Sequence, residues 1–304
     1  MSSQGVKRPR YGSPFCLQLR WHFAIPRRTI GWLPDERKAV EDYHARQLEQ
    51  AQRWQETLTA VAVANQQIRQ LREKAEELLQ KEELFEAIAA YEELTKLQLS
   101  PADNKVLYSL YARTMQWDKA VDTGLRTPES FYVRDQTALL YGSGRNEEYL
   151  KARQQLLADY QTLNQPWQFS GHLMMSSLLP VESELHPAIR HLADGCSTSP
   201  EPYEKAMVGK AMYRLGVFET WYENLEDDSP LKAGQDFLVQ ITQFKNNPTE
   251  ENREKLLQAI ERQKESADKQ ITDGALGKYW WGYIERMAWV REGERVLNSG
   301  ESPP

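Results

Sequence analysis

The stretch ELFEAIAAY, residues 83–91, is the part of the sequence that decides the fold. Its apolar residues recur at helical spacing, with the small Ala87 followed four positions later by Tyr91, and Pro101 closes the segment. Thirty-three residues further on, the stretch WDKAV at 117–121 repeats this arrangement and again runs to a proline. A recurrence of this length predicts an array of packed helix pairs.

This pattern resembles the tetratricopeptide repeat, whose second helix carries a small residue against the first helix and an aromatic residue four positions later. A shorter copy lies at 144–149, and a clearer one at 209–219 has Gly209 and Gly216 at the helix-packing and turn positions. Small residues would let the paired helices approach closely. The resemblance covers 71–266 and implies an all-α, right-handed helix-turn-helix solenoid.

Four segments are expected along the chain. Residues 1–34 are expected to form a basic, disordered leader, 35–70 a long helical arm, 71–266 the tetratricopeptide-like repeats, and 267–304 a capping helix with a disordered tail. The arm is rich in helix formers and has no proline or glycine. Its apolar residues recur at mixed spacings, so an arm that extends the repeats and a coiled-coil arm for self-association both remain open.

An aromatic cluster marks the expected last helix, at about 277–297. Tyr279, Tyr283, Met287 and Val290 recur at spacings of four and three, which predicts one apolar face. We expect this face to close the end of the solenoid, and a patch that binds a partner is the alternative.

A second similarity concerns regulation. The order of the repeats, the helix at 134–140, the step at 178–180 and the closing 291–297 are similar to the helical-repeat tails of large bacterial serine/threonine protein kinases. This similarity implies a bacterial regulatory module that is not itself catalytic. The chain has no Gly-rich loop and no His-Arg-Asp or Asp-Phe-Gly motif, so it is not a kinase.

The sequence assigns no catalytic, cofactor-binding or metal-binding residue. His186 and His191 are five residues apart, which places them on different faces of a helix. Only Cys16 and Cys196 occur, so no disulfide framework or cysteine zinc site is expected, and a reducing, cytoplasmic compartment fits. Carboxylates alternate with lysines and arginines at helical spacing, as on a solvated face. We therefore expect a binding protein that is not an enzyme.

Charge and hydropathy narrow the range of partners. The formal net charge is −6, although residues 1–34 contain six cations and no acid, so the remainder carries about −12. An acidic folded part argues against nucleic-acid binding. The stretch 17–33 is interrupted by three arginines, a histidine and a proline, which argues against a membrane span. The acid-free segment 1–34 has the bias of a transit peptide, and we expect instead an unstructured leader.

The tetratricopeptide resemblance also implies a binding surface, because the first helix of each unit lines the concave face. The positions that it aligns there are Arg72, Lys105, Arg113, Arg134, Tyr141, Lys210, Tyr213 and Arg214. We expect a groove for an acidic or carboxylate-ended polypeptide, with scattered exposed cations as the alternative. The carboxylate clamp of chaperone-binding relatives is not reproduced, since Glu76 and Ser109 stand where asparagine is expected. The predicted function is a scaffold or adaptor for a protein partner.

Overall fold

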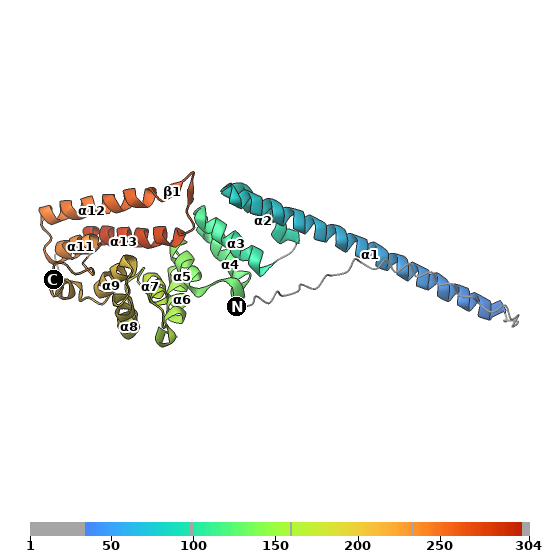
Figure 1. Ribbon diagram of the computed structural model, residues 1–304, viewed down its shortest axis with the longest axis horizontal. Coiled ribbons are helices and arrows are strands. Elements are labelled where there is room, and N and C mark those ends of the chain that lie inside the picture. Colours follow the sequence, from blue (N-terminus) through green and yellow to red (C-terminus); the bar gives the residue numbers. More distant parts are fainter. Residues whose placement is uncertain (1–33, 98–99, 159, 233, 300–304) are drawn as a thin grey trace, which may run out of the picture. The chain divides into compact units, whose positions relative to one another are not determined.

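A computed structural model describes residues 34–97, 100–158, 160–232 and 234–299, and this part of the chain is almost entirely helical (Figure 1). The all-α class predicted from the sequence is confirmed. The expected disordered leader and the expected disordered tail fall at 1–33 and 300–304, outside the described residues. The chain divides into two compact units, residues 1–61 and 62–304, which we describe separately.

The helices follow one another through short turns, and successive helices from α2 to α9 pack together. The α-helices are α1 Pro34–Gln80, α2 Leu84–Leu97, α3 Pro101–Arg113, α4 Trp117–Leu125, α5 Val133–Gly142, α6 Asn146–Ala158, α7 Pro166–Ser176, α8 His186–Ser197, α9 Pro202–Arg214, α10 Phe218–Glu223, α11 Asp236–Asn246, α12 Glu250–Asp268 and α13 Trp280–Asn298. Three 3₁₀ turns, η1 Pro128–Ser130, η2 Tyr160–Thr162 and η3 Ser183–Leu185, and two short strands, β1 Ile271–Thr272 and β2 Ala275–Leu276, complete the described elements.

Proline sets the start of several helices. α3, α7 and α9 begin at Pro101, Pro166 and Pro202. A proline in the first turn removes an amide that has no partner within the helix, and its fixed φ already suits the helix. The prolines visible in the sequence therefore mark where these helices begin.

One turn recurs between the two helices of four pairs. Its central residues, Glu82, Met115, Gly144 and Gly216, all have left-handed backbones with φ between 58° and 76°. In each turn the next amide donates to the carbonyl oxygen five residues earlier, at 2.8 to 3.0 Å. This is the Schellman arrangement, which satisfies the carbonyl oxygens left free where a helix ends. The same device closes the first helix of these four pairs.

Small residues lie where helices approach most closely. Ala87 and Ala120 are completely buried. A methyl group on Gly124 would lie 2.6 Å from the Phe131 ring, so the turn after α4 packs directly on this glycine. The buried apolar side chains of the described residues form one continuous core, which runs from the end of α1 to α13.

The last helices form a hairpin that packs across earlier pairs. β1 and β2 join α12 to α13 in an antiparallel ribbon that turns at Asp273 and Gly274. α13 packs on α5, α11 and α12, and Figure 1 shows it running beside α12 along these elements. α13 therefore contacts helices that are far apart in sequence.

The burial of α13 also differs from the predicted apolar face. Val290 of the predicted face is buried and Tyr283 and Met287 pack against the core, whereas Tyr279 is 63% exposed and Ile284, outside that face, is buried. The difference arises because α13 packs on several sides at once, and burial then does not follow a single stripe of apolar residues.

α1 is one continuous helix with no break near residue 70, where the sequence analysis placed the change from arm to repeat. The described residues of the first unit, 34–61, are all exposed, and they include Trp54 and Leu58. Within the second unit, Ile68 packs against the core and Ala75 is fully buried. The last turns of α1 therefore act as the first helix of the first pair.

Candidate functional site

The predicted concave residues lie on α1, α3, α5 and α9, the first helices of their pairs. The structure separates them into two groups. Five of them contact α13 or the strand that precedes it, and these are Arg113, Tyr141, Lys210, Tyr213 and Arg214. The other three, Arg72, Lys105 and Arg134, have different surroundings. The expected stripe is therefore filled by the chain itself along part of its length.

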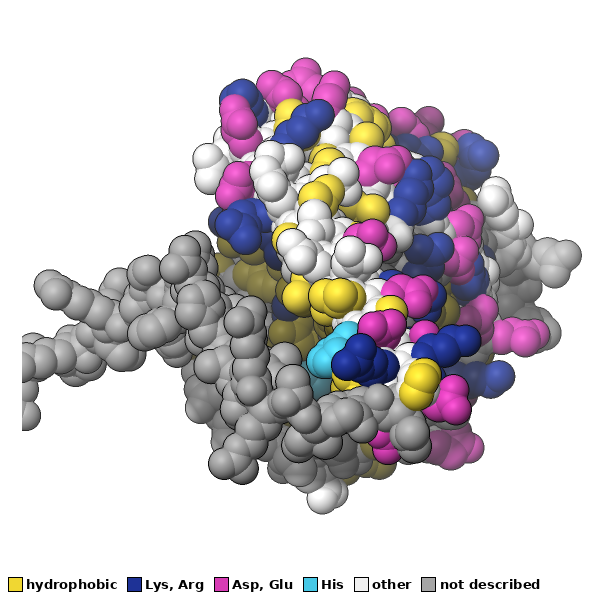
Figure 2. Space-filling view, turned by 90° about the vertical axis from the view of Figure 1, so that its right-hand side faces the viewer, with side chains coloured by type: hydrophobic (Ala, Val, Ile, Leu, Met, Phe, Trp, Pro, Cys, Tyr) yellow, Lys and Arg dark blue, Asp and Glu magenta, His cyan; other side chains and the backbone are white. Residues whose placement is uncertain are grey.

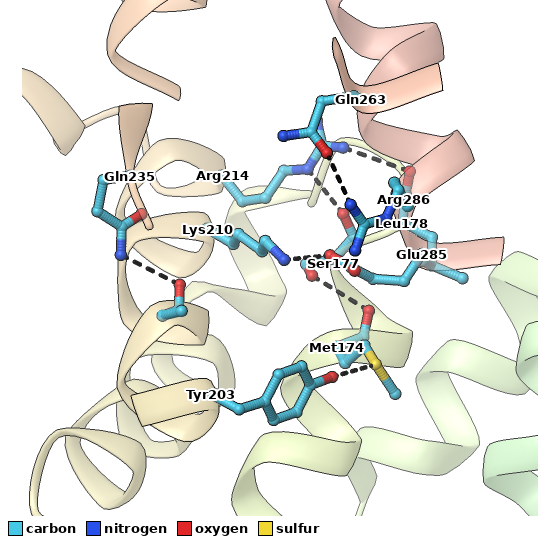
Figure 3. A network of polar contacts seen from close by, with 11 residues as sticks. Met174, Ser177, Leu178, Tyr203, Lys210, Arg214, Gln235, Gln263, Glu285 and Arg286 are labelled. Atoms are coloured by element: carbon cyan, nitrogen blue, oxygen red, sulfur yellow. Dashed lines mark hydrogen bonds and ion pairs between the residues drawn. The ribbon is translucent and has the colours of Figure 1, made fainter. Parts of the chain in front are cut away.

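Arg214 is a buried cation, with 2% of its side chain exposed. Its Nε donates to the Ser177 carbonyl oxygen at 2.9 Å, and its Nη1 lies 3.4 Å from Glu292 Oε2 (Figure 3 shows the surrounding network). The guanidinium also lies 4.4 Å from the Trp289 ring centroid. Burial lowers the pKa of Arg214, and the Glu292 charge opposes this shift. Arg214 thus joins α9 to α7 and α13.

Glu292 is the acidic counterpart on α13. Burial alone would raise the pKa of its carboxyl group, but the hydrogen bond from Arg295 and the charge of Arg214 outweigh burial and hold the pKa below its ordinary value. The Tyr213 hydroxyl donates to the same carboxylate at 3.0 Å, and burial together with this charge raises the pKa of Tyr213. Three side chains therefore hold Glu292 in its ionised form.

A second ion pair, between Lys210 and Glu285, lies on the same two helices. Both side chains are largely buried, and Figure 3 shows the lysine reaching from α9 toward the carboxylate. Beside them, Arg286 donates to Ser266 and lies 3.4 Å from Gln263, which joins α13 to α12. Such desolvated pairs are strongly destabilised when one partner is removed.

Two predicted residues meet the start and the middle of the C-terminal segment. The Arg113 Nε donates to the Leu276 carbonyl oxygen at 3.1 Å, which joins α3 to β2. Tyr141 is buried, and the Arg291 guanidinium lies 5.4 Å from its ring centroid. These contacts and the two ion pairs extend from α3 to α9, so the C-terminal segment follows the first helices of several pairs.

Arg72 and Lys105 have partners outside the C-terminal segment. Arg72 makes two hydrogen bonds to the buried Asp103 carboxylate, which raise the pKa of the guanidinium and join α1 to α3. The Lys105 ammonium lies 4.1 Å from the ring centroid of Tyr132. Arg72 therefore has a structural role, whereas Lys105 adds positive charge beside an exposed aromatic ring.

Arg134 lies at an open pocket of about 450 Å³ between the N-terminal ends of α5 and α7. The residues that line this pocket are Tyr132, Val133, Arg134, Leu156, Trp167, Gln168, Gly171 and His172. Tyr132 is 57% exposed and Trp167 is 61% exposed. Large exposed aromatic side chains beside a cation are typical of binding surfaces.

The Arg134 side chain keeps its terminal nitrogens available. Its Nε lies 3.5 Å from Asp135 Oδ1, and Asp135 also accepts a hydrogen bond from the Tyr108 hydroxyl at 3.1 Å. Among the described residues, neither Nη atom of Arg134 makes a hydrogen bond, and the guanidinium pairs with Asp135. A methyl group on Gly171 would lie 3.4 Å from Arg134 Cδ, an ordinary van der Waals contact, so α7 passes close beside the arginine.

His172 forms the inner wall of the pocket. Its Nδ1 lies 2.8 Å from the Gln168 carbonyl oxygen, so this nitrogen carries the proton and donates it, and Nε2 is left as an acceptor. Burial lowers the pKa of His172, and the nearby Arg134 charge lowers it further. The imidazole is therefore neutral at pH 7. Arg134 is the cation that lines the pocket, and Lys105 lies beside it against the Tyr132 ring.

Sequence reasoning missed both halves of this surface. Glu285 and Glu292 look like ordinary surface acids in the sequence, and only the packing of α13 pairs them with α9. Tyr132 directly precedes α5, and Trp167 follows the proline that begins α7. Aromatic residues at the starts of α5 and α7 were the available signal.

The surface elsewhere carries mixed charge. On the face shown in Figure 2, Lys and Arg side chains are interspersed with Asp and Glu side chains. Within the described ranges, no helix is long and apolar enough to cross a membrane. The same residues contain no group of three His, Cys, Asp or Glu side chains placed to hold a metal ion.

No protein-family model, no curated protein and no solved structure matches this chain.

Proposed function

We propose that the protein is a tetratricopeptide-like adaptor that binds a polypeptide partner on the inner face of a helical-repeat solenoid and is not itself catalytic. The shared left-handed turn of four helix pairs supports the repeat interpretation of 71–266. The first helices of the pairs form the inner face in this arrangement. Part of that face is covered by α13, and the remainder is available to a partner.

The observation that carries the proposal is the open pocket between α5 and α7. Its exposed Tyr132 and Trp167 offer rigid apolar area, and Arg134 offers hydrogen-bond donors that have no partner among the described residues. A pocket that combines aromatic side chains with a few polar groups is suited to holding a peptide side chain and fixing its direction. The buried carboxylates nearby, Glu285 and Glu292, are held by cations, which suits a structural role more than acid–base chemistry.

An adaptor of this kind can serve an enzyme that is a separate chain. The similarity to kinase tails suggests one such setting, in which the partner is the catalytic subunit of a kinase system. The regulatory role would then consist of holding that subunit in place.

The test is affinity capture with three forms of the full chain: wild type, the double variant Tyr132→Ala with Trp167→Ala, and the control Arg253→Gln. Arg253 lies in the first turn of α12 and pairs with Glu250, away from the pocket residues. We expect one defined partner, captured in fixed proportion by wild type and by the control, and lost with the double variant. Capture of the same proteins by all three forms would contradict binding at this pocket.

Circular dichroism of each form keeps the result interpretable. Both aromatic side chains of the double variant are more than half exposed, so their removal leaves the core intact and helix content should not change.

A further inference from the structure

The occupied part of the inner face shows which chemistry this surface accepts. α13 presents two glutamates, Glu285 and Glu292, to the cations of α9. It also presents aromatic rings: Trp289 lies over Arg214, and Trp280 lies 6.4 Å from Trp117, measured between ring centroids. A segment with acidic and aromatic side chains therefore already fills one part of the face.

The open pocket repeats the chemistry of the covered part. Lys105 and Arg134 provide two positive charges, as Lys210 and Arg214 do under α13. Asp135 is the acidic side chain nearest to Arg134, and it also accepts a hydrogen bond from Tyr108. The positive ends of the α5 and α7 dipoles open to the same pocket and add to its preference for negative charge. Two cations therefore lie at or beside this pocket, one of them paired with Asp135, on a protein that is acidic overall.

The apolar part of the pocket is suited to one large side chain. Leu156 is buried behind the pocket, while Tyr132 and Trp167 contribute exposed rings, and the cavity holds about 450 Å³. An aromatic or large aliphatic residue can enter here while a neighbouring carboxylate meets the guanidinium, as a charge-assisted pair.

We infer that the pocket between α5 and α7 binds an acidic polypeptide segment that carries one aromatic or large aliphatic side chain, with Arg134 as the residue that selects negative charge. This inference rests on the proposed adaptor function and specifies the class of partner. It assigns to the partner the same chemistry that α13 presents to the covered part of the inner face.

The experiment uses the full chain and short synthetic peptides in fluorescence anisotropy. The probe is a labelled peptide with one tryptophan flanked by glutamates, compared with a peptide in which the glutamates are lysines and a peptide in which the tryptophan is alanine. We expect wild type to bind the first peptide and to bind each of the others about tenfold or more weakly, as expected for the loss of one charge-assisted or apolar contact.

Charge reversal makes the test specific to Arg134. Arg134→Gln should weaken binding of the acidic peptide about tenfold, and Arg134→Glu should shift the binding preference toward the lysine peptide. Arg253→Gln is the matched control and should bind like wild type. The arginine side chain is 42% exposed, so circular dichroism should show each variant folded.

Three outcomes would overturn the inference. They are equal binding of acidic and basic peptides by wild type, an unchanged preference in Arg134→Glu, and no binding of the acidic peptide at about 1 mM. If affinity capture still yields a partner that depends on the pocket, only the acidic class is wrong. If capture also fails, the adaptor function itself is wrong.

Discussion

Residues with left-handed backbones show how unequal members of one repeated turn can be. Gly144 and Gly216 adopt positive φ without steric strain, whereas Glu82 and Met115 adopt it at a cost of about 1 kcal/mol each. The fold maintains the turn in all four pairs, because the closing hydrogen bond is the same. The strain therefore belongs to the two pairs that lack glycine.

Glu82→Gly should stabilise the protein, because glycine removes the strain and the exposed glutamate loses no packing. We expect a rise of about 0.5–1 kcal/mol in the free energy of unfolding, measured by urea denaturation. Glu82→Ala is the control, since it keeps a Cβ atom and should show no comparable gain. A loss of stability in the glycine variant would mean that φ at this position is not left-handed in solution.

Glu292→Gln should destabilise the protein, because it leaves the buried Arg214 charge without its acidic partner. At neutral pH we expect a loss of about 3 kcal/mol in the free energy of unfolding. The stability that ionised Glu292 contributes is fully present above its ordinary pKa of 4.5 and is lost as the pH falls through the lowered pKa of the folded state.

Acid titration separates this effect from simple loss of packing. As the pH falls below 4.5, wild type should lose stability more steeply than Glu292→Gln, and the two curves should converge. Urea unfolding at a series of pH values measures this. Parallel curves would show that Glu292 is not the group that titrates.

Among the elements, α1 carries a stripe of large apolar side chains that is exposed in the described part of the first unit. Trp54, Leu58 and Val61 follow at spacings of four and three, which places them on one side of the helix, and each is more than half exposed. Exposed large apolar residues at this spacing favour a partner helix. The self-association that the sequence left open would use this stripe.

Leu58→Glu tests this use of α1. We expect wild type to show concentration-dependent self-association in sedimentation equilibrium and Leu58→Glu to remain monomeric, because a buried glutamate in a helix pair is costly. Glu56→Gln is the control, because Glu56 lies on the opposite side of the helix from Leu58, and this variant should behave like wild type. A wild-type protein that stays monomeric at all concentrations would contradict self-association through α1.

α13 was predicted as a helix at about 277–297, close to its bounds in the structure, but the helices that it contacts were not predicted. Pro101 and Pro166 mark helix starts by a local rule, so the helix pairs could be predicted from the chain alone. The burial of α13 depends on tertiary packing against other helices, and no local pattern encodes that. The open pocket was missed for the same reason, although Arg134 was among the predicted residues. The left-handed turns at Glu82 and Met115 could not be predicted, because these positions lack the glycine that marks the same turn in the other two pairs.

For the second unit as a whole, α13 connects pairs that are distant in sequence. In a simple array each pair contacts only its neighbours, so local opening can occur anywhere. Here α3, α5 and α9 all contact the C-terminal segment, so opening one pair disturbs contacts made by the others. This part of the protein should therefore behave more cooperatively than a simple array.

Ile284→Ala should reveal that coupling. Ile284 is buried on α13, next to Gly142 of α5, and its truncation should cost about 3 kcal/mol. Hydrogen exchange should show faster exchange in both α5 and α9, which are far apart in sequence, with little change in α2. Faster exchange confined to α13 would indicate that the array behaves as independent neighbours.

The span of α13 also limits how this protein could change in evolution. Repeat arrays commonly lengthen by duplication of a unit, yet the 19 residues of α13 reach only about 28 Å. Tyr141 of α5 and Arg214 of α9 meet adjacent residues of α13, Arg291 and Glu292, so an extra pair inserted between α5 and α9 would break one of these contacts. The C-terminal helix thus limits the number of pairs that can lie between α5 and α9.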